Sequence, residues 1–146
     1  MEIEKSTLLL QKKDYELLAE FRYALRRFLR FSEQAAKKYN LAPQQYQALL
    51  AIEGFKGRNH VTVGELAEQL QVAHHTAVEL VQRLEKIQLV RRQNLPGDQR
   101  KVWISLTNKG MELLEKLYLI HRREIRSVGP QISKLLREAA EKMPGE

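Results

Sequence analysis

The sequence predicts a mainly α-helical protein built around a winged helix–turn–helix core, with long helices on both sides of that core. Two short amphipathic segments, joined by three residues, fill positions 62–86. Two strand-like segments around a Pro-Gly turn follow directly, and long amphipathic stretches occupy both ends of the chain. Paired helices followed by strand content around a turn are typical of a helix–turn–helix with a two-stranded wing.

The first long helix is expected from Asp14 to Asn40. Apolar residues recur in this stretch at helical spacing, and arginines and lysines fill much of the other side. A shorter helix is expected from Pro43 to about Glu53, because proline suits the first turn of a helix.

The helix–turn–helix has a strong start signal. Thr62 is expected at the N-cap and Glu65 three positions later, a capping box in which each side chain satisfies a free amide at the helix start. The second helix of such a pair can enter the major groove of DNA. Its expected buried side consists of Ala77, Leu80, Val81 and Leu84.

The wing is expected from two segments, Leu89–Asn94 and Lys101–Leu106, joined by the turn Leu95–Asp98. Trp103 lies between Val102 and Ile104 in the second segment, so we expect it to pack in the core.

The C-terminal part is expected to form two helices. Thr107 caps a long helix that Gly129 and Pro130 interrupt, because proline cannot continue a helix, and a short helix follows over Gln131–Lys142. These helices and the first one are too long and too apolar for one small winged helix to cover. An apolar stripe without a partner in its own chain usually finds one in another chain, which favours a homodimer.

The ordered set of motifs resembles the MarR (multiple antibiotic resistance regulator) family of transcriptional regulators, from about Arg22 to the last helix. The matching motifs are Leu41-Ala42-Pro43-Gln44-Gln45-Tyr46, Glu65-Leu66-Ala67, Arg83-Leu84-Glu85-Lys86, Leu89-Val90-Arg91-Arg92, Asp98-Gln99-Arg100 and Leu106-Thr107-Asn108-Lys109-Gly110.

The resemblance implies one MarR-like domain over residues 1–146. Residues 1–40 and 111–146 would be dimerisation helices, and residues 41–110 a DNA-binding lobe. It further implies a homodimeric repressor that binds a pseudo-palindromic site in double-stranded DNA, because a two-fold dimer matches a two-fold site. Release by a small aromatic or lipophilic effector is the common behaviour of the family.

The expected DNA-binding residues lie on the second helix and on the wing. Gln82 can pair with adenine in the major groove, and imidazole or hydroxyl groups can pair with bases or phosphates. The matching family arginine reaches the minor groove, so Arg100 is the preferred wing contact, with Asp98 orienting it. The full expected set is His74, His75, Thr76, Glu79, Gln82, Lys86, Arg91, Arg92, Arg100 and Lys101.

Three positions depart from the family pattern. Glu79 stands where a small or basic residue is usual, and phosphate would repel it unless it accepts a hydrogen bond from cytosine. Ala73 replaces the usual serine or threonine cap, and Gln71 stands where the turn often has glycine. These departures concern the contacts of the second helix and the geometry of the turn.

The net charge of +7 favours a polyanionic partner, but the charge is unevenly distributed. Residues 62–106, the helix–turn–helix and wing, are the part expected to read DNA and are called the reading head here. This stretch carries six basic and five acidic side chains, so it is nearly neutral. The chain has no cysteine, which excludes disulfides and cysteine-based redox sensing. Without a signal peptide or membrane span we expect a cytoplasmic protein.

Other function classes have weaker support. No nucleophile elbow, phosphate loop or paired-carboxylate motif indicates an enzyme. The four histidines do not form a set of metal ligands, so neither a metal nor a cofactor is expected. The main alternative is a winged helix that binds another protein and has no specific DNA site, which Glu79 and the near-neutral reading head favour.

Overall fold

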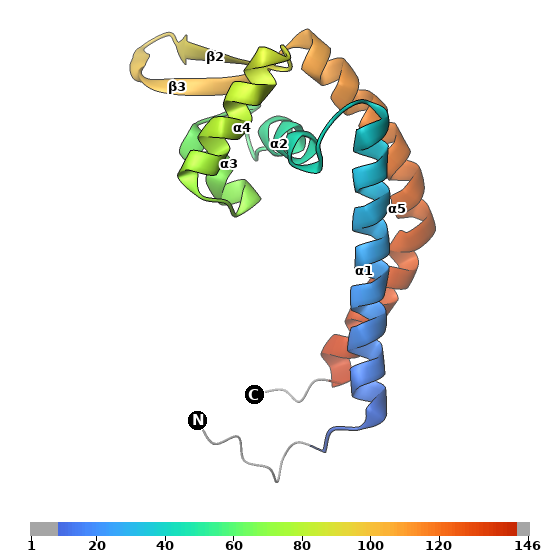
Figure 1. Cartoon of the computed structure of the whole chain (residues 1–146). Helices are drawn as coiled ribbons and strands as arrows, with labels where there is room; N and C mark the ends of the chain where they lie inside the picture. The colour runs from blue at the N-terminus through green and yellow to red at the C-terminus, as the bar shows by residue number, and fades with distance from the viewer. Residues whose placement is uncertain (1–8, 143–146) are drawn as a thin grey trace. The chain divides into compact units, whose positions relative to one another are not determined.

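The computed structural model describes residues 9–142, with the side chains of Leu95, Asp98 and Lys142 left out (Figure 1). Two compact units divide this part of the chain. The terminal-helix unit holds the residues up to Ser32 and from His121 onward, and the winged-helix unit holds Glu33–Ile120. The elements are α1 (Lys12–Lys38), α2 (Pro43–Glu53), β1 (His60–Val61), α3 (Val63–Leu70), α4 (His74–Lys86), β2 (Val90–Leu95), β3 (Asp98–Leu106) and α5 (Asn108–Lys142).

The winged-helix unit is organised around one apolar core. The buried side predicted for the second short helix is confirmed, because Ala77, Leu80, Val81 and Leu84 of α4 are all buried. Leu66 on α3 is fully buried beside them. Helix α2 contributes Leu49 and Ile52, and β3 contributes Ile104. The core therefore joins the helix–turn–helix to the base of the sheet, which fixes the orientation of α4.

The sheet has a strand that the sequence analysis did not expect. Its order is β1-β3-β2, antiparallel throughout, and Val61 of β1 pairs with Ile104 of β3. A strand of two residues is too short to show alternation, so only its pairing with β3 reveals it. This pairing ties the segment before α3 to the wing.

The wing is longer and its turn tighter than expected. Strands β2 and β3 reach Leu95 and Asp98, so only Pro96 and Gly97 form the turn, with Gly97 at φ 86°. The register shifts between Gln93 and Leu95. The Asn94 side-chain amide donates to two β3 carbonyls at this irregularity, those of Gln99 at 3.2 Å and Lys101 at 3.1 Å.

The expectation for Trp103 is wrong. Trp103 is half-buried rather than part of the core, because its neighbour Ile104 takes the fully buried position and successive side chains of a strand point to opposite faces.

The expected break at Gly129 and Pro130 is also wrong, because α5 continues through Pro130. Proline removes one backbone hydrogen bond from a helix interior. The apolar face nevertheless continues beyond it, since Leu135 and Ala139 are buried with Leu17 of α1 in the terminal-helix unit. This packing outweighs the local cost. No described helix is long and apolar enough to cross a membrane.

Candidate nucleic-acid interface

Helix α3 begins at a complete capping box, as predicted. The Glu65 amide donates to Thr62 Oγ1 at 3.2 Å, and Glu65 Oε1 accepts from the Thr62 amide at 3.0 Å. Arg58 forms an ion pair with the Glu65 carboxylate. The hydrogen bond from Arg58 holds the pKa of Glu65 at about 2, below its usual value of 4.5. The start of α3 is therefore held by a charge-assisted network.

The turn between α3 and α4 contains both departures noted in the sequence. Gln71 adopts a left-handed conformation at φ 54°, and its side-chain amide donates to the Glu68 carbonyl at 2.8 Å. This bond offsets part of the cost of the left-handed backbone, which glycine would avoid. Ala73 is the N-cap of α4 and provides no side-chain cap.

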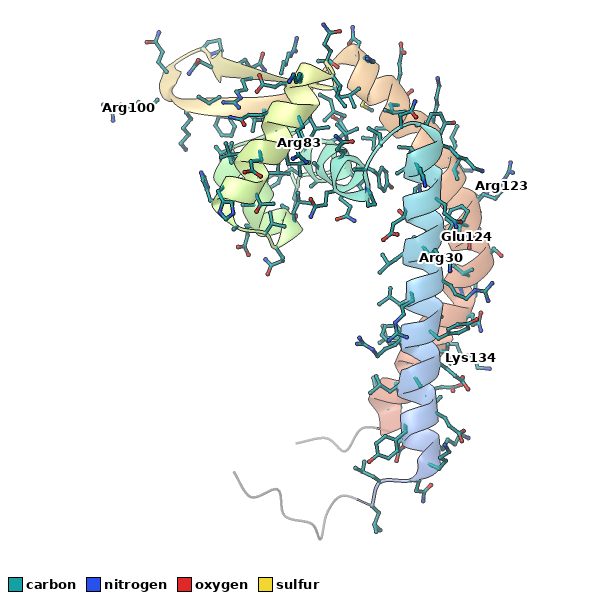
Figure 2. All side chains as sticks on the ribbon, in the orientation of Figure 1. Arg30, Arg83, Arg100, Arg123, Glu124 and Lys134 are labelled. Carbon is teal, nitrogen blue, oxygen red and sulfur yellow. The ribbon has the colours of Figure 1, made fainter. Side chains whose placement is uncertain are left out.

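The outward side of α4 is polar and exposed. His75, Glu79, Gln82 and Lys86 are all exposed, as is His74 at the start of the helix, whereas Thr76 is half-buried. Arg83, the residue after Gln82, is also exposed on α4 (Figure 2). Arg83 is absent from the expected contact set, although its position one residue from Gln82 could have marked it as a contact.

The charge on this side of α4 is mixed. Glu79 lies between the histidines and Arg83, and no described residue forms an ion pair with it. Glu85, by contrast, pairs with Arg92 of β2 at 2.5 Å. The carboxylate of Glu79 is therefore the exposed negative charge that a phosphate backbone would meet on this helix.

The wing carries four exposed basic residues: Arg91, Arg92, Arg100 and Lys101. Arg92 is engaged by Glu85, and Arg91 Nε donates to Ser105 Oγ at 3.4 Å. Arg100 lies near the end of the wing and points away from both strands (Figure 2). The side chain of Asp98 lies outside the described residues, so its orienting role stays a prediction.

The C-terminal end of α4 is attached to the start of α5. Thr107 Oγ1 donates to the Gln88 carbonyl at 2.6 Å, and the Lys109 ammonium donates to the Ile87 carbonyl at 3.2 Å. Gly110 packs so closely that a Cβ there would lie 2.2 Å from the Leu89 carbonyl oxygen. Thr107 also accepts from the Gly110 amide at 3.1 Å, which confirms it as a helix cap.

An apolar pocket of about 460 Å³ lies between α2 and the first half of α5. Drug-sized ligands occupy pockets of this size. The charged side chains in its lining are both carboxylates, Glu53 and Glu115. The lining consists of Tyr46, Leu50, Glu53, Gly54, Met111, Leu114, Glu115, Tyr118 and Leu119.

Among the described residues, no three His, Cys, Asp or Glu side chains lie close enough together to hold one metal ion. His121 is buried in the terminal-helix unit, where its Nε2 lies 2.8 Å from Ser32 Oγ.

These features define a winged helix–turn–helix fold. The family model described as MarR family matches residues 39–101, from the end of α1 into the wing. Over this stretch the chain is similar to the MarR family.

Named relatives and solved structures show the same similarity. MgrA of Staphylococcus aureus, an HTH-type transcriptional regulator, is 30% identical over 87 residues, which are 60% of this chain and 57% of MgrA. A MarR family protein from Bacillus stearothermophilus has a TM-score of 0.74 at 24% identity, covering 93% of this chain and 99% of that one. The S. aureus MepR–DNA complex has a TM-score of 0.66 at 22% identity, covering 84% and 89%. These two structures share the fold.

Proposed function

We propose that this chain is a homodimeric repressor that binds a pseudo-palindromic DNA site through α4 and the wing. The observation that carries the proposal is the exposed polar side of α4, which includes Gln82 and Arg83, together with a wing that carries the outward-pointing Arg100 near its end. The amide of Gln82 can read adenine, and arginine can read guanine. A protein of the same fold, S. aureus MepR, has been solved bound to DNA.

The dimer is supported by the terminal-helix unit, which buries little of its own apolar surface. Large apolar side chains remain exposed on both of its helices: Tyr15, Leu18, Tyr23, Leu25, Leu29, Ile125 and Leu136. Exposed apolar surface of this extent is typical of an interface. Sedimentation should give about twice 17.1 kDa at micromolar concentration, and a well-behaved monomer would overturn the two-half-site model.

The proposed effector site is the pocket between α2 and α5. A ligand that separated these helices would act on α4, because the start of α5 binds the carbonyls of Ile87 and Gln88 at the end of α4. The lining favours an aromatic or lipophilic body with a cationic group, since Glu53 and Glu115 would attract positive charge. Such a ligand must bind the two conformations unequally, with about 1–3 kcal/mol of coupling.

Single substitutions can distinguish the contribution of the wing to DNA binding from that of α4. Arg100→Ala should weaken binding on all sequences and most on A·T-rich flanks, because its contact is to groove shape and potential. Gln82→Ala should instead relax the preference at particular base pairs, by roughly 1–3 kcal/mol for a bidentate contact. If Arg100→Ala binds like wild type on every sequence and at every salt concentration, the wing does not contact DNA.

Glu79→Ala decides the role of the exposed carboxylate. If Glu79 only suffers phosphate repulsion, the variant should bind all DNA more tightly. If Glu79 accepts a hydrogen bond from cytosine, specific binding should fall while non-specific binding rises. An unchanged affinity for both kinds of DNA would remove α4 from the interface and favour a protein-binding winged helix.

A further inference from the structure

One side chain of the winged-helix unit joins four different segments. The Arg58 guanidinium donates to Glu65 Oε1 at 2.8 Å and pairs with its second oxygen, which attaches it to the first turn of α3. The same group donates to the carbonyl of His60 in β1 at 3.1 Å. It also lies 4.4 Å from the ring centre of Phe55, in the loop after α2.

The fourth segment is the wing strand β3. The Arg58 guanidinium lies 5.0 Å from the ring centre of Trp103, and the His60 ring meets Trp103 edge-on at 4.9 Å. Lys101 Nζ lies 5.7 Å from the same ring. Two cations and one imidazole therefore surround the indole, and cations at these distances are attracted to the face of an aromatic ring.

We propose that Arg58 is a positioning residue that fixes the wing strand against the start of α3 and so sets where Arg100 and Lys101 meet DNA. The proposal rests on the proposed DNA-binding function. It assigns a role in that function to Arg58, a residue that is not among the expected DNA contacts. Its basis is that one planar group holds a bidentate carboxylate, a β1 carbonyl and two aromatic rings at once.

The chemistry requires arginine rather than any cation. A guanidinium offers a flat face for stacking and a rigid fork of donors for a carboxylate, whereas a lysine ammonium can do only part of this. The other anchors act elsewhere on the sheet, because the ion pair of Arg92 with Glu85 holds β2 and the buried Ile104 holds the base of β3. Loss of the guanidinium should therefore leave β3 in place but allow its outer half to move relative to α3.

The first measurement uses Trp103, the single tryptophan of the chain, as a reporter. Arg58→Gln should change the emission of Trp103, and Arg58→Lys should restore it only in part. The matched control is Lys134→Gln, which removes an ion pair at 3.9 Å with Glu138 in the terminal-helix unit. Emission equal to wild type in Arg58→Gln would overturn the proposal, whether or not the protein binds DNA.

The second measurement tests coupling to the wing on a duplex selected from a random pool. Arg58→Gln should weaken binding by about tenfold, comparable with Arg100→Ala. The double variant Arg58→Gln/Arg100→Ala should be only slightly weaker than either single variant, because both remove the same contact. Adding Gln82→Ala to Arg58→Gln should instead multiply the two losses.

The outcomes separate the two proposals. If wild type prefers no sequence, the proposed function fails, and Trp103 emission alone decides whether Arg58 holds the strand. If wild type binds specifically and the effects of Arg58→Gln and Arg100→Ala multiply, the positioning role is wrong. If Arg58→Gln does not fold, Phe55→Leu removes one stacking ring, keeps the ion pair and should show the same coupling to Arg100 in reduced size.

Discussion

The two units of this chain bury their apolar residues to very different extents. In the winged-helix unit Leu49, Ile52 and Leu66 are completely buried in a core that all its helices and strands share. In the terminal-helix unit the buried cluster is Leu17, Leu135 and Ala139, each 5–8% exposed. The winged-helix unit has a complete apolar core, whereas the terminal-helix unit leaves many of its large apolar side chains exposed.

This difference indicates that the two units have different roles. A unit with a complete core can present α4 and the wing in a fixed geometry, which base recognition requires. A pair of long helices with an exposed apolar side gains most of its stability from association. Substitutions should therefore act on the fold itself in the winged-helix unit and on assembly in the terminal-helix unit.

The largest expected effect comes from paired glycine substitutions in α5, one in each unit. Gly110→Ala should destabilise the protein by more than about 3 kcal/mol, because its Cβ would lie 2.2 Å from the Leu89 carbonyl oxygen. Gly129→Ala should change stability by less than about 1 kcal/mol, since its nearest neighbour, the Ile125 side chain, lies 3.7 Å away and the crowding before Pro130 offsets the gain in helix propensity. Urea unfolding measures both, and equal effects would contradict the difference in packing.

Pro130→Ala should stabilise α5 by up to about 3 kcal/mol, because it restores a backbone hydrogen bond in the helix interior. The gain should appear as a higher stability of the proposed dimer in concentration-dependent thermal unfolding, with the affinity for a selected DNA duplex unchanged. A destabilised variant would indicate that the proline is needed at this position for the assembly of the helices.

The stability of the winged-helix unit should fall in acid through Glu65. Its pKa is about 2 in the folded protein and 4.5 without the network, so the stabilisation is complete above pH 4.5 and is lost as the pH falls toward 2. The expected size is on the order of 2 kcal/mol. Glu65→Gln should remove this part of the pH dependence in urea unfolding at a series of pH values, and an unchanged profile would contradict the assignment.

The smallest expected effect is that of Gln71→Gly in the turn before α4. Glycine adopts the left-handed conformation without a steric cost, so the variant should gain about 0.5–1 kcal/mol, reduced by loss of the 2.8 Å bond to the Glu68 carbonyl. Thermal unfolding checks the gain. A clear loss of stability would show that the Gln71 side chain contributes more than its backbone costs.

The features that the sequence predicted best are those that depend on residues close together in the chain. The capping box of Thr62 and Glu65 and the buried side of α4 depend on spacings of three or four residues, and both are confirmed. The continuity of α5 through Pro130 depends on packing against α1, which local propensity cannot reveal. The cluster around Arg58 includes Trp103, which lies far from Arg58 along the chain, so no local spacing could have indicated this contact.

The central claim is that this chain reads a DNA sequence, and one measurement tests it most directly. Fluorescence anisotropy should compare a duplex selected from a random pool with a scrambled duplex of the same composition over a range of salt. The account predicts a selected duplex that binds at least about 10³-fold more tightly, with affinities for both duplexes falling steeply as salt rises. Equal and weak binding of the two duplexes would contradict the account and favour a protein-binding winged helix.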